Sequence, residues 1–245
     1  MADTSSGAIR AIVLDFNGTL AQDNHLVAPL FVEMFASVGV PLTPDDYYRD
    51  LAALPDREVA ELAIRRAGLP LHRAHRDALV SDRLEGYLTA VEEQSPIAEH
   101  TIGFVRSAAK RVELAIASGA FRREIEHVLC AAGIRDCFKV VVSIDEVSHG
   151  KPHPEGFHRA LAELNALAGT EPPIEPHQTV AVEDATGGAQ AARAAGMWVT
   201  AIGGPGYDVS SGLADLVIDR LDRRSLELLL ELGSTGRSPA PGSAR

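Results

Sequence analysis

The feature that most constrains the fold is a series of short, continuous apolar runs, each followed by polar or glycine residues. The runs are Ile9–Leu14, Val112–Ala117, Val140–Ile144, Val180–Val182, Trp198–Ile202 and Leu216–Ile218. Runs of this length are typical of strands buried on both faces, as in a parallel sheet. Helical patterns lie between several of them, at Phe121–Ala132, Pro154–Leu164 and Thr186–Ala195. This alternation predicts an α/β fold with a doubly wound parallel sheet.

One long segment interrupts the alternation. Residues 21–95 carry no strand pattern, only helical patterns such as Pro29–Val38, Asp56–Ala67 and His72–Val91. We therefore expect a core of residues 1–20 and 96–232, with a helical subdomain of residues 21–95 inserted after the first strand. Residues 233–245 are rich in Gly, Ser and Pro, which predicts a disordered tail.

Charge and cysteine content narrow the possible partners. The chain has 34 acidic and 23 basic residues, a net charge of −11, which argues against binding to nucleic acid or to an anionic membrane. No apolar run reaches the roughly 18 residues of a membrane helix, and the first residues lack a secretion signal. Two cysteines cannot form a disulfide framework. We expect a cytoplasmic protein, either a monomer or a small homo-oligomer.

Polar residues follow four of the apolar runs at the points where the strands should end. Asp15 follows the first run, Ser118-Gly119 the second, Lys151 lies beyond the third, and Glu183-Asp184 end the fourth. Ligands of such sheets bind at the carboxyl ends of the strands, so these side chains should meet in one crevice. Several buried carboxylates need a compensating cation, and oxygen ligands of this kind suit Mg²⁺.

The residue types at this edge indicate phosphoryl chemistry. Ser118 could donate a hydrogen bond to a phosphate oxygen, Lys151 could neutralise its charge, and Mg²⁺ could bridge phosphate and protein. Asp15, at the end of a strand, could then attack phosphorus and form an aspartyl-phosphate.

Four sequence motifs carry a resemblance to a known family. They are DFNGTL at 15–20, ASG at 117–119, GKPHPEGF at 150–157 and VEDATGGAQAARAAGM at 182–197. In this order, and each at a predicted strand end, they resemble the haloacid dehalogenase-like hydrolase superfamily, subfamily IA. The branch is that of β-phosphoglucomutase and phosphoglycolate phosphatase. The resemblance covers about residues 9–219 and implies a Rossmann-like core with an inserted helical cap.

The resemblance also implies roles for individual residues. Asp15 would be the nucleophile, and Ser118-Gly119 and Lys151 would hold the phosphate. Asp15, the backbone carbonyl of Asn17 and Glu183-Asp184 would form the Mg²⁺ site.

Asn17 departs from the family pattern. Phosphatases and mutases of this family normally have a second Asp there, which acts as general acid and base. An amide cannot transfer that proton, and such catalysis is typically worth about 10²–10⁴ in rate. Either the activity is low, or the leaving group needs no proton, or another group supplies one, for which Asp23 and His25 are the nearest candidates. Dehalogenases of the family also lack this Asp, but Glu183-Asp184 would have no purpose in dehalogenation.

Arg57 is the candidate specificity residue. Leu54–Glu58 resembles a cap loop that presents an Arg to the substrate in the mutase branch. The alternative is a surface Arg in the first turn of a helix that Asp56 caps and whose dipole Glu58 complements.

Three histidines, His149, His153 and His158, surround Lys151. We find no Cys or carboxylate after them at the spacing of a metal site, so the sequence predicts surface histidines.

The resulting expectation is a Mg²⁺-dependent phosphatase of small phosphorylated metabolites, such as sugar or polyol phosphates. Two alternatives stay open, a phosphosugar mutase and a catalytically weakened protein that binds phosphate ligands. Asn17 disfavours the mutase more than the phosphatase, because a mutase moves a proton in both half-reactions.

Overall fold

The computed structural model describes residues 7–52, 54–169, 171–203, 211–234 and 239. The strands are β1 (Ala11–Leu14), β2 (Glu113–Ala117), β3 (Val140–Val142), β4 (Thr179–Glu183), β5 (Trp198–Ile202) and β6 (Leu216–Ile218). The helices are α1 (Asn24–Ser37), α2 (Pro44–Asp50), α3 (Asp56–Arg66), α4 (Arg73–Glu93), α5 (Glu99–Ala108), α6 (Arg122–Ala131), α7 (Glu155–Ala168), α8 (Thr186–Ala194) and α9 (Arg223–Glu231). Short 3₁₀ turns are η1 (Arg135–Cys137), η2 (Ile144–Glu146), η3 (Pro176–Gln178) and η5 (Leu232–Ser234). None of the helices in these described ranges is both long and apolar enough to cross a membrane.

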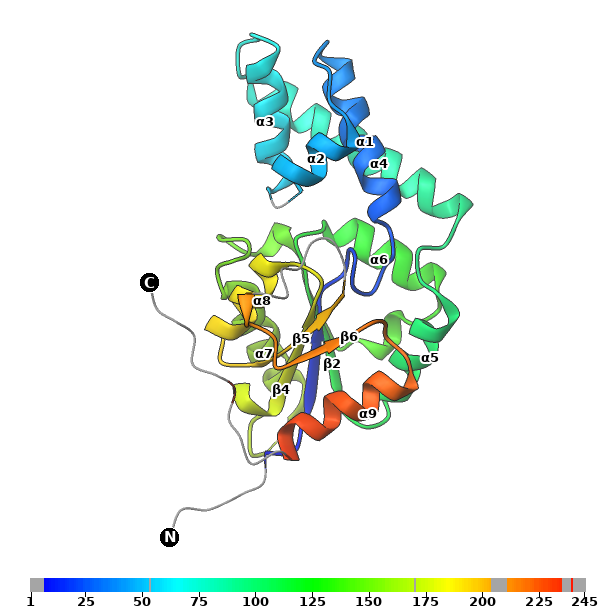
Figure 1. Ribbon diagram of the computed structural model, residues 1–245, viewed down its shortest axis with the longest axis vertical. Coiled ribbons are helices and arrows are strands. Elements are labelled where there is room, and N and C mark those ends of the chain that lie inside the picture. The colour runs from blue at the N-terminus through cyan, green and yellow to red at the C-terminus, as the bar shows by residue number, and fades with distance from the viewer. Residues whose placement is uncertain (1–6, 53, 170, 204–210, 235–238, 240–245) are drawn as a thin grey trace. The chain divides into compact units, whose positions relative to one another are not determined.

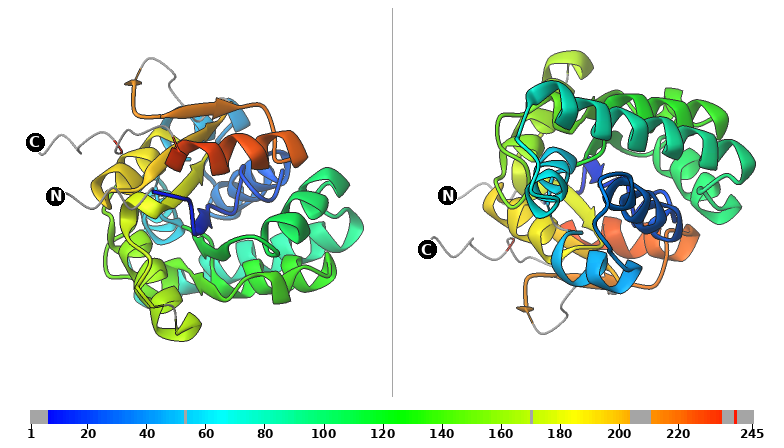
Figure 2. Two further views of the ribbon diagram at one scale, coloured as in Figure 1. Left: turned by 90° about the horizontal axis from the view of Figure 1, so that it is seen from below. Right: turned by 90° about the horizontal axis from the view of Figure 1, so that it is seen from above.

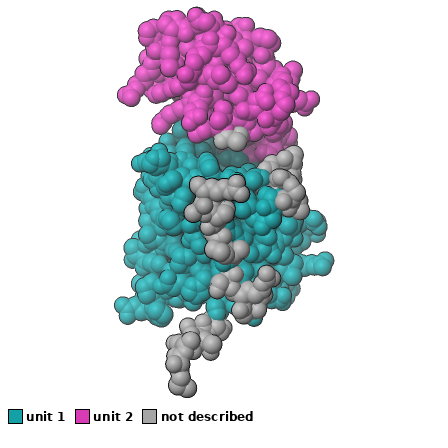
Figure 3. Space-filling model, turned by 60° about the vertical axis from the view of Figure 1, so that its left-hand side comes forward, with its two compact units in different colours: residues 1–21, 97–245 teal, residues 22–96 magenta. Residues whose placement is uncertain are grey.

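The chain divides into two compact units, one of residues 1–21 and 97–245 and the other of residues 22–96 (Figure 3). The larger unit holds a single sheet in the order β3-β2-β1-β4-β5-β6, with every neighbouring pair parallel. This is the strand order of a Rossmann-like fold. The predicted fold class, a parallel α/β sheet with a helical insertion after its first strand, is confirmed.

Helices cover both faces of the sheet (Figure 1). α7 packs on β2 and β3, and α8 packs on β4 and β5, over a face lined largely by small residues such as Ala115, Ala117 and Ala181. α5 and α9 pack against each other on the opposite side. β1, β3, β4 and β5 are therefore buried on both faces, which is why they appear in the sequence as continuous apolar runs instead of alternating ones.

The unit of residues 22–96 is made of the four helices α1 to α4, which Figure 2 shows from above. α1 packs against the other three, and Phe31 of α1 stacks on Tyr47 of α2 with ring centroids 4.8 Å apart. α2 was not predicted; Thr43 and Asp46 start it with a reciprocal capping box, and Pro44 occupies its first position.

The end of the chain is only partly described. Leu232–Ser234 forms a 3₁₀ turn, and its last two residues, of which Gly233 is buried, belong to the stretch predicted as a disordered tail. Of the remaining tail, residues 235–238 and 240–245 lie outside the described residues.

One close contact between helix and sheet fixes a carboxylate. Gly188 lies in the first turn of α8, opposite Glu183 at the end of β4. A Cβ atom at position 188 would lie 2.0 Å from Oε2 of Glu183, a distance that no pair of non-bonded atoms tolerates. Glycine at this position therefore makes the space in which the Glu183 carboxylate lies.

We predict that Gly188→Ala lowers the free energy of unfolding by about 1–3 kcal/mol, because the added methyl displaces the Glu183 carboxylate from a packed site. Urea unfolding measures the change. Gly187→Ala is the matched control: its Cβ meets no atom within 4 Å, and in a helix alanine is favoured over glycine by about 1 kcal/mol. Equal stability of the two variants would contradict this account of the packing.

Candidate active site

A buried lysine joins two carboxylates at the carboxyl edge of the sheet. The Nζ atom of Lys151 lies 2.5 Å from Oδ1 of Asp15 and 2.6 Å from Oε1 of Glu183. Asp15 is 7% exposed and Glu183 1% exposed. Asp15 directly follows β1, and its backbone N–H donates to the carbonyl of Val182 in β4 at 2.9 Å. The sheet thus brings together three residues that are 32 to 168 positions apart in the chain.

The charges of this group depend on each other. Burial raises the pKa of Glu183 well above its ordinary value; Lys151 opposes this shift, and the Asp15 carboxylate adds to it. Burial lowers the pKa of Lys151, but the attraction of Asp15 and Glu183 outweighs that effect and raises it overall. Lys151 is therefore held in its charged form.

Asp184 adds a third carboxylate, and the set fits a hard cation. Asp15, Glu183 and Asp184 each offer an oxygen atom, and these atoms all lie within 4.8 Å of one another. Three carboxylates face one ammonium group, so an additional positive charge would balance the site. Because every side-chain ligand is an oxygen atom, the group suits Mg²⁺ better than a softer metal.

Asn17 lies in a tight turn that follows Asp15. Asn17 forms an isolated bridge with Ala21, and the N–H of Gly18 donates to the Ala21 carbonyl at 2.7 Å. Gly18 has a φ of 73°, which glycine adopts without strain. Phe16, between the two polar residues, is fully buried and anchors the turn in the core. Asn17 is thus held two residues after Asp15 by backbone bonds on both sides.

Ser118 and Gly119 lie at the end of β2, beside the lysine loop. The N–H of Ser118 donates to the carbonyl of Val142 at 3.0 Å, and its hydroxyl accepts from the N–H of Ala120 at 3.2 Å. A small pocket is lined by Ser118, Gly119 and Lys151. The structure therefore brings together Ser118, Gly119 and Lys151, whose role in holding the phosphate stays a prediction.

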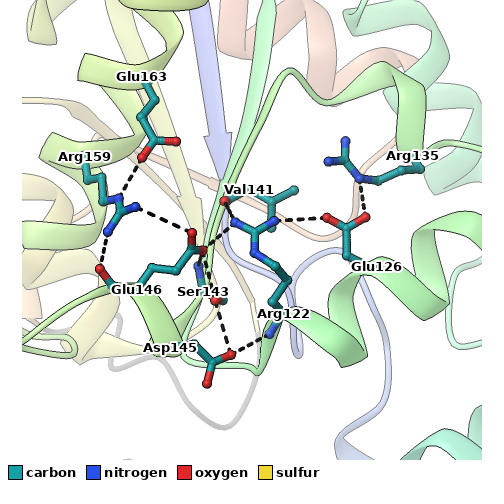
Figure 4. A network of polar contacts seen from close by, with 9 residues as sticks. All are labelled: Arg122, Glu126, Arg135, Val141, Ser143, Asp145, Glu146, Arg159 and Glu163. Atoms are coloured by element: carbon teal, nitrogen blue, oxygen red, sulfur yellow. Dashed lines mark hydrogen bonds and ion pairs between the residues drawn. The ribbon is translucent and has the colours of Figure 1, made fainter.

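A network of charged side chains fixes the turn that leads to Lys151 (Figure 4). Glu146 of η2 accepts from the N–H of Ser143 at 3.0 Å and pairs with Arg122 of α6 at 2.5 Å and with Arg159 of α7 at 3.6 Å. Burial raises the pKa of Glu146, but the hydrogen bonds from Ser143 and Arg122 outweigh it and lower the pKa. The turn after β3 is therefore held from two helices, five residues before the catalytic lysine candidate.

The candidates in the helical unit have different surroundings. Arg57 is exposed in the first turn of α3, and its role as specificity residue stays a prediction. Asp56 does not cap α3: its carboxylate pairs with the buried Arg83 of α4, and Pro55 is the N-cap residue. Asp23 is not exposed to solvent at all and accepts a hydrogen bond from the Tyr87 hydroxyl at 2.5 Å, whereas His25 is exposed.

For two residues near the site, only the packing shows what they contact. Gly188 makes room for Glu183, but only the three-dimensional packing shows which of the two neighbouring glycines does so. Glu155 lies beside His149 and His153, and thereby supplies the carboxylate that the sequence pattern did not reveal. Glu155 lies only two residues after His153 in the sequence, but this spacing is not typical of a metal-binding motif.

Comparison with known proteins agrees with this geometry. A family model described as haloacid dehalogenase-like hydrolase matches residues 9–196. A phosphorylated carbohydrates phosphatase from Thermotoga maritima is 28% identical over 200 residues, which cover 77% of this chain and 82% of the relative. The protein CbbY from Cereibacter sphaeroides is 30% identical over 205 residues, with 77% and 82% covered.

Solved structures share the fold. The crystal structure of β-phosphoglucomutase from Clostridium difficile superposes with a TM-score of 0.77 at 18% identity, and the match covers 92% of this chain and 97% of that one. The family resemblance predicted from the four motifs is confirmed. With its parallel sheet, its helical insertion and the matched residues 9–196, the chain belongs to the haloacid dehalogenase-like hydrolase family.

Proposed function

We propose that this protein is a Mg²⁺-dependent phosphatase that hydrolyses small phosphorylated metabolites, such as sugar or polyol phosphates, through a phospho-aspartate on Asp15. The observation that carries the proposal is the Lys151 ammonium group between Asp15 and Glu183, in a loop that shares a pocket with Ser118 and Gly119. The phosphatase from Thermotoga maritima, named for phosphorylated carbohydrates, supports the class of substrate.

In the first step, a carboxylate oxygen of Asp15 attacks phosphorus. A bond forms between that oxygen and phosphorus, while the bond from phosphorus to the substrate's alcohol oxygen breaks in line with it. The charged Lys151 attracts the phosphoryl oxygens as negative charge builds on them. Ser118 donates a hydrogen bond from its hydroxyl group to one of these oxygens, and the Gly119 backbone leaves room for the group.

The cation site assists the same step. Asp15, Glu183, Asp184 and the backbone carbonyl of Asn17 would hold Mg²⁺. When bound, this ion neutralises phosphate charge and orients the phosphoryl group.

Asn17 determines which steps of the proposed reaction are slow. The departing alcohol oxygen needs a proton, and the water that later attacks the phospho-aspartate must lose one. The Asn17 amide can donate a hydrogen bond to either oxygen, but it transfers no proton. We infer that the binding and charge-stabilising parts of the site are complete and that its proton donor is missing.

The unit of residues 22–96 would act as a cap that excludes water and selects the substrate. We propose that Arg57, which is exposed on α3, contacts a polar group of the substrate other than the reacting phosphate.

We predict that Asn17→Asp raises the rate of phosphate release from sugar phosphates by about 10²–10⁴, because it restores general acid catalysis. The same substitution should change the first-turnover burst of p-nitrophenol from p-nitrophenyl phosphate much less, since this leaving group departs without a proton. Steady-state phosphate release measures the first effect, and leaving-group release in the first turnover, followed with and without Mg²⁺ over a series of leaving groups, measures the second.

Asp15→Ala serves as the inactive control in that series. An equal gain in first-turnover rate on all leaving groups would contradict a missing proton donor. No turnover by either protein, with Mg²⁺ and inorganic phosphate still bound, would favour the phosphate-binding alternative over an enzyme.

We further predict that phosphate release from β-glucose 1-phosphate exceeds its conversion to glucose 6-phosphate. A mutase needs the missing proton transfer twice in each cycle, whereas an acidic leaving group lets a phosphatase dispense with one of the transfers. Coupled assays of both products on the same sample show which of the two rates is higher. Conversion faster than phosphate release would favour the phosphosugar mutase.

A further inference from the structure

Two exposed histidines and a glutamate meet on the loop that carries Lys151. Nδ1 of His149 lies 3.0 Å from Oε2 of Glu155, and Nδ1 of His153 lies 4.0 Å from the same oxygen. The two imidazole rings face each other at a tilt of 37°, with centroids 4.7 Å apart. Each of the three side chains offers one ligand atom, and these atoms all lie within 4.8 Å of one another.

These separations match those of a tetrahedral zinc site. Zn²⁺ binds His nitrogen at about 2.0–2.1 Å, which puts neighbouring ligand atoms of a tetrahedron about 3.3 Å apart. The two distances to Glu155, 3.0 and 4.0 Å, lie on either side of that value. Small side-chain rotations would therefore be enough to place all three ligand atoms around one ion.

The backbone holds the carboxylate ligand in place. Oε1 of Glu155 accepts from the N–H of Ser148 at 2.7 Å, and Oε2 accepts from the N–H of His149 at 3.0 Å. Glu155 is the first residue of α7, so its position is also fixed by the helix. Hydrogen bonds of this kind orient the ligands of metal sites and raise their affinity.

The ligand types distinguish this cluster from the Asp15 site. Two imidazoles with one carboxylate suit Zn²⁺ and related transition metals, whereas Mg²⁺ prefers oxygen ligands alone. The His149 side chain is 66% exposed and that of His153 52% exposed, so an ion can enter from solvent. Three protein ligands leave one position of the tetrahedron for water.

We propose that His149, His153 and Glu155 form a second metal site, which binds Zn²⁺ or a similar transition-metal ion. Its ligands lie two residues before, two after and four after Lys151, and both histidines line the pocket that Ser118, Gly119 and Lys151 also line. The bound ion therefore fixes the loop on both sides of Lys151. The site stands on its own geometry and does not depend on the proposed phosphatase activity.

Isothermal titration of untagged protein with Zn²⁺, in the presence of saturating Mg²⁺, tests the site. We expect one Zn²⁺ bound per chain, and binding at least about 10-fold weaker in the double variant His149→Gln/His153→Gln, which loses two of the three ligands. Glu155→Gln should also weaken binding. His158→Gln is the matched control, because His158 is an exposed histidine of α7 outside the cluster, and it should bind Zn²⁺ as the unchanged protein does.

The cysteines provide a second control. Cys130 is exposed, and a thiol is a good ligand for Zn²⁺, so Cys130→Ser/Cys137→Ser is titrated in parallel and should retain binding. Urea unfolding of the double histidine variant without metal checks that it folds as the unchanged protein does. Absence of Zn²⁺ binding by the unchanged protein would overturn the proposal. Equal binding by the folded double histidine variant, or binding that disappears only with the cysteines, would overturn it as well.

Discussion

The bridge from the Lys151 ammonium group to Asp15 and Glu183 is the interaction on which the site depends. Carboxylates buried to this degree are costly unless a positive charge compensates them, and Lys151 supplies one within hydrogen-bond distance of both. The three residues come from β1, β4 and the loop after β3, so the bridge can form only when the parallel sheet has its observed order. Fold and site are therefore coupled: the sheet brings the charges together, and the charges determine which ligand the site can accept.

The same balance of charge explains what the site can and cannot do. Three carboxylates and one lysine leave excess negative charge, which suits a divalent cation, and cation and lysine together suit a phosphoryl group. In the proposed mechanism, the general acid and base would come from the residue two positions after Asp15, where the backbone turn holds the Asn17 amide, which cannot exchange a proton. Under this proposal, attraction of the phosphate and transfer of the proton are separated, and chemistry that needs only the first is favoured.

Much of the fold could be predicted because buried parallel strands are visible in the sequence as apolar runs. Helices and helix ends that depend on tertiary contacts for their stability were not predicted. α5 and α9 were not predicted; they are short amphipathic helices that pack against each other, and α9 begins at the Asp222 cap. α1 begins five residues before Pro29, where we expected the helix to start, because Phe31 and Phe35 bury its following turns.

The site residues that follow strands could be predicted from the sequence. The contacts that depend on tertiary packing could not. Asp15, Ser118, Lys151 and Glu183 each follow a strand, so parallel topology alone brings them to one edge. The sequence does not show which of Gly187 and Gly188 must lack a side chain, or that Asp56 pairs with Arg83 across 27 residues instead of capping its own helix. The sequence predicts the histidines around Lys151 as surface residues, and they are exposed. Their proximity to Glu155 could not be predicted, because a cluster formed with the first residue of a helix has no fixed spacing.

The central claim is that Asp15 carries the phosphoryl group during turnover, and acid quenching followed by mass spectrometry tests it most directly. With p-nitrophenyl phosphate and Mg²⁺, p-nitrophenol leaves readily but the water step lacks a proton acceptor, so the phosphorylated enzyme should accumulate. We predict the added mass of one phosphoryl group on the peptide that contains Asp15, and its absence from Asp15→Ala. A phosphoryl group on another residue, or undiminished turnover by Asp15→Ala, would contradict the account.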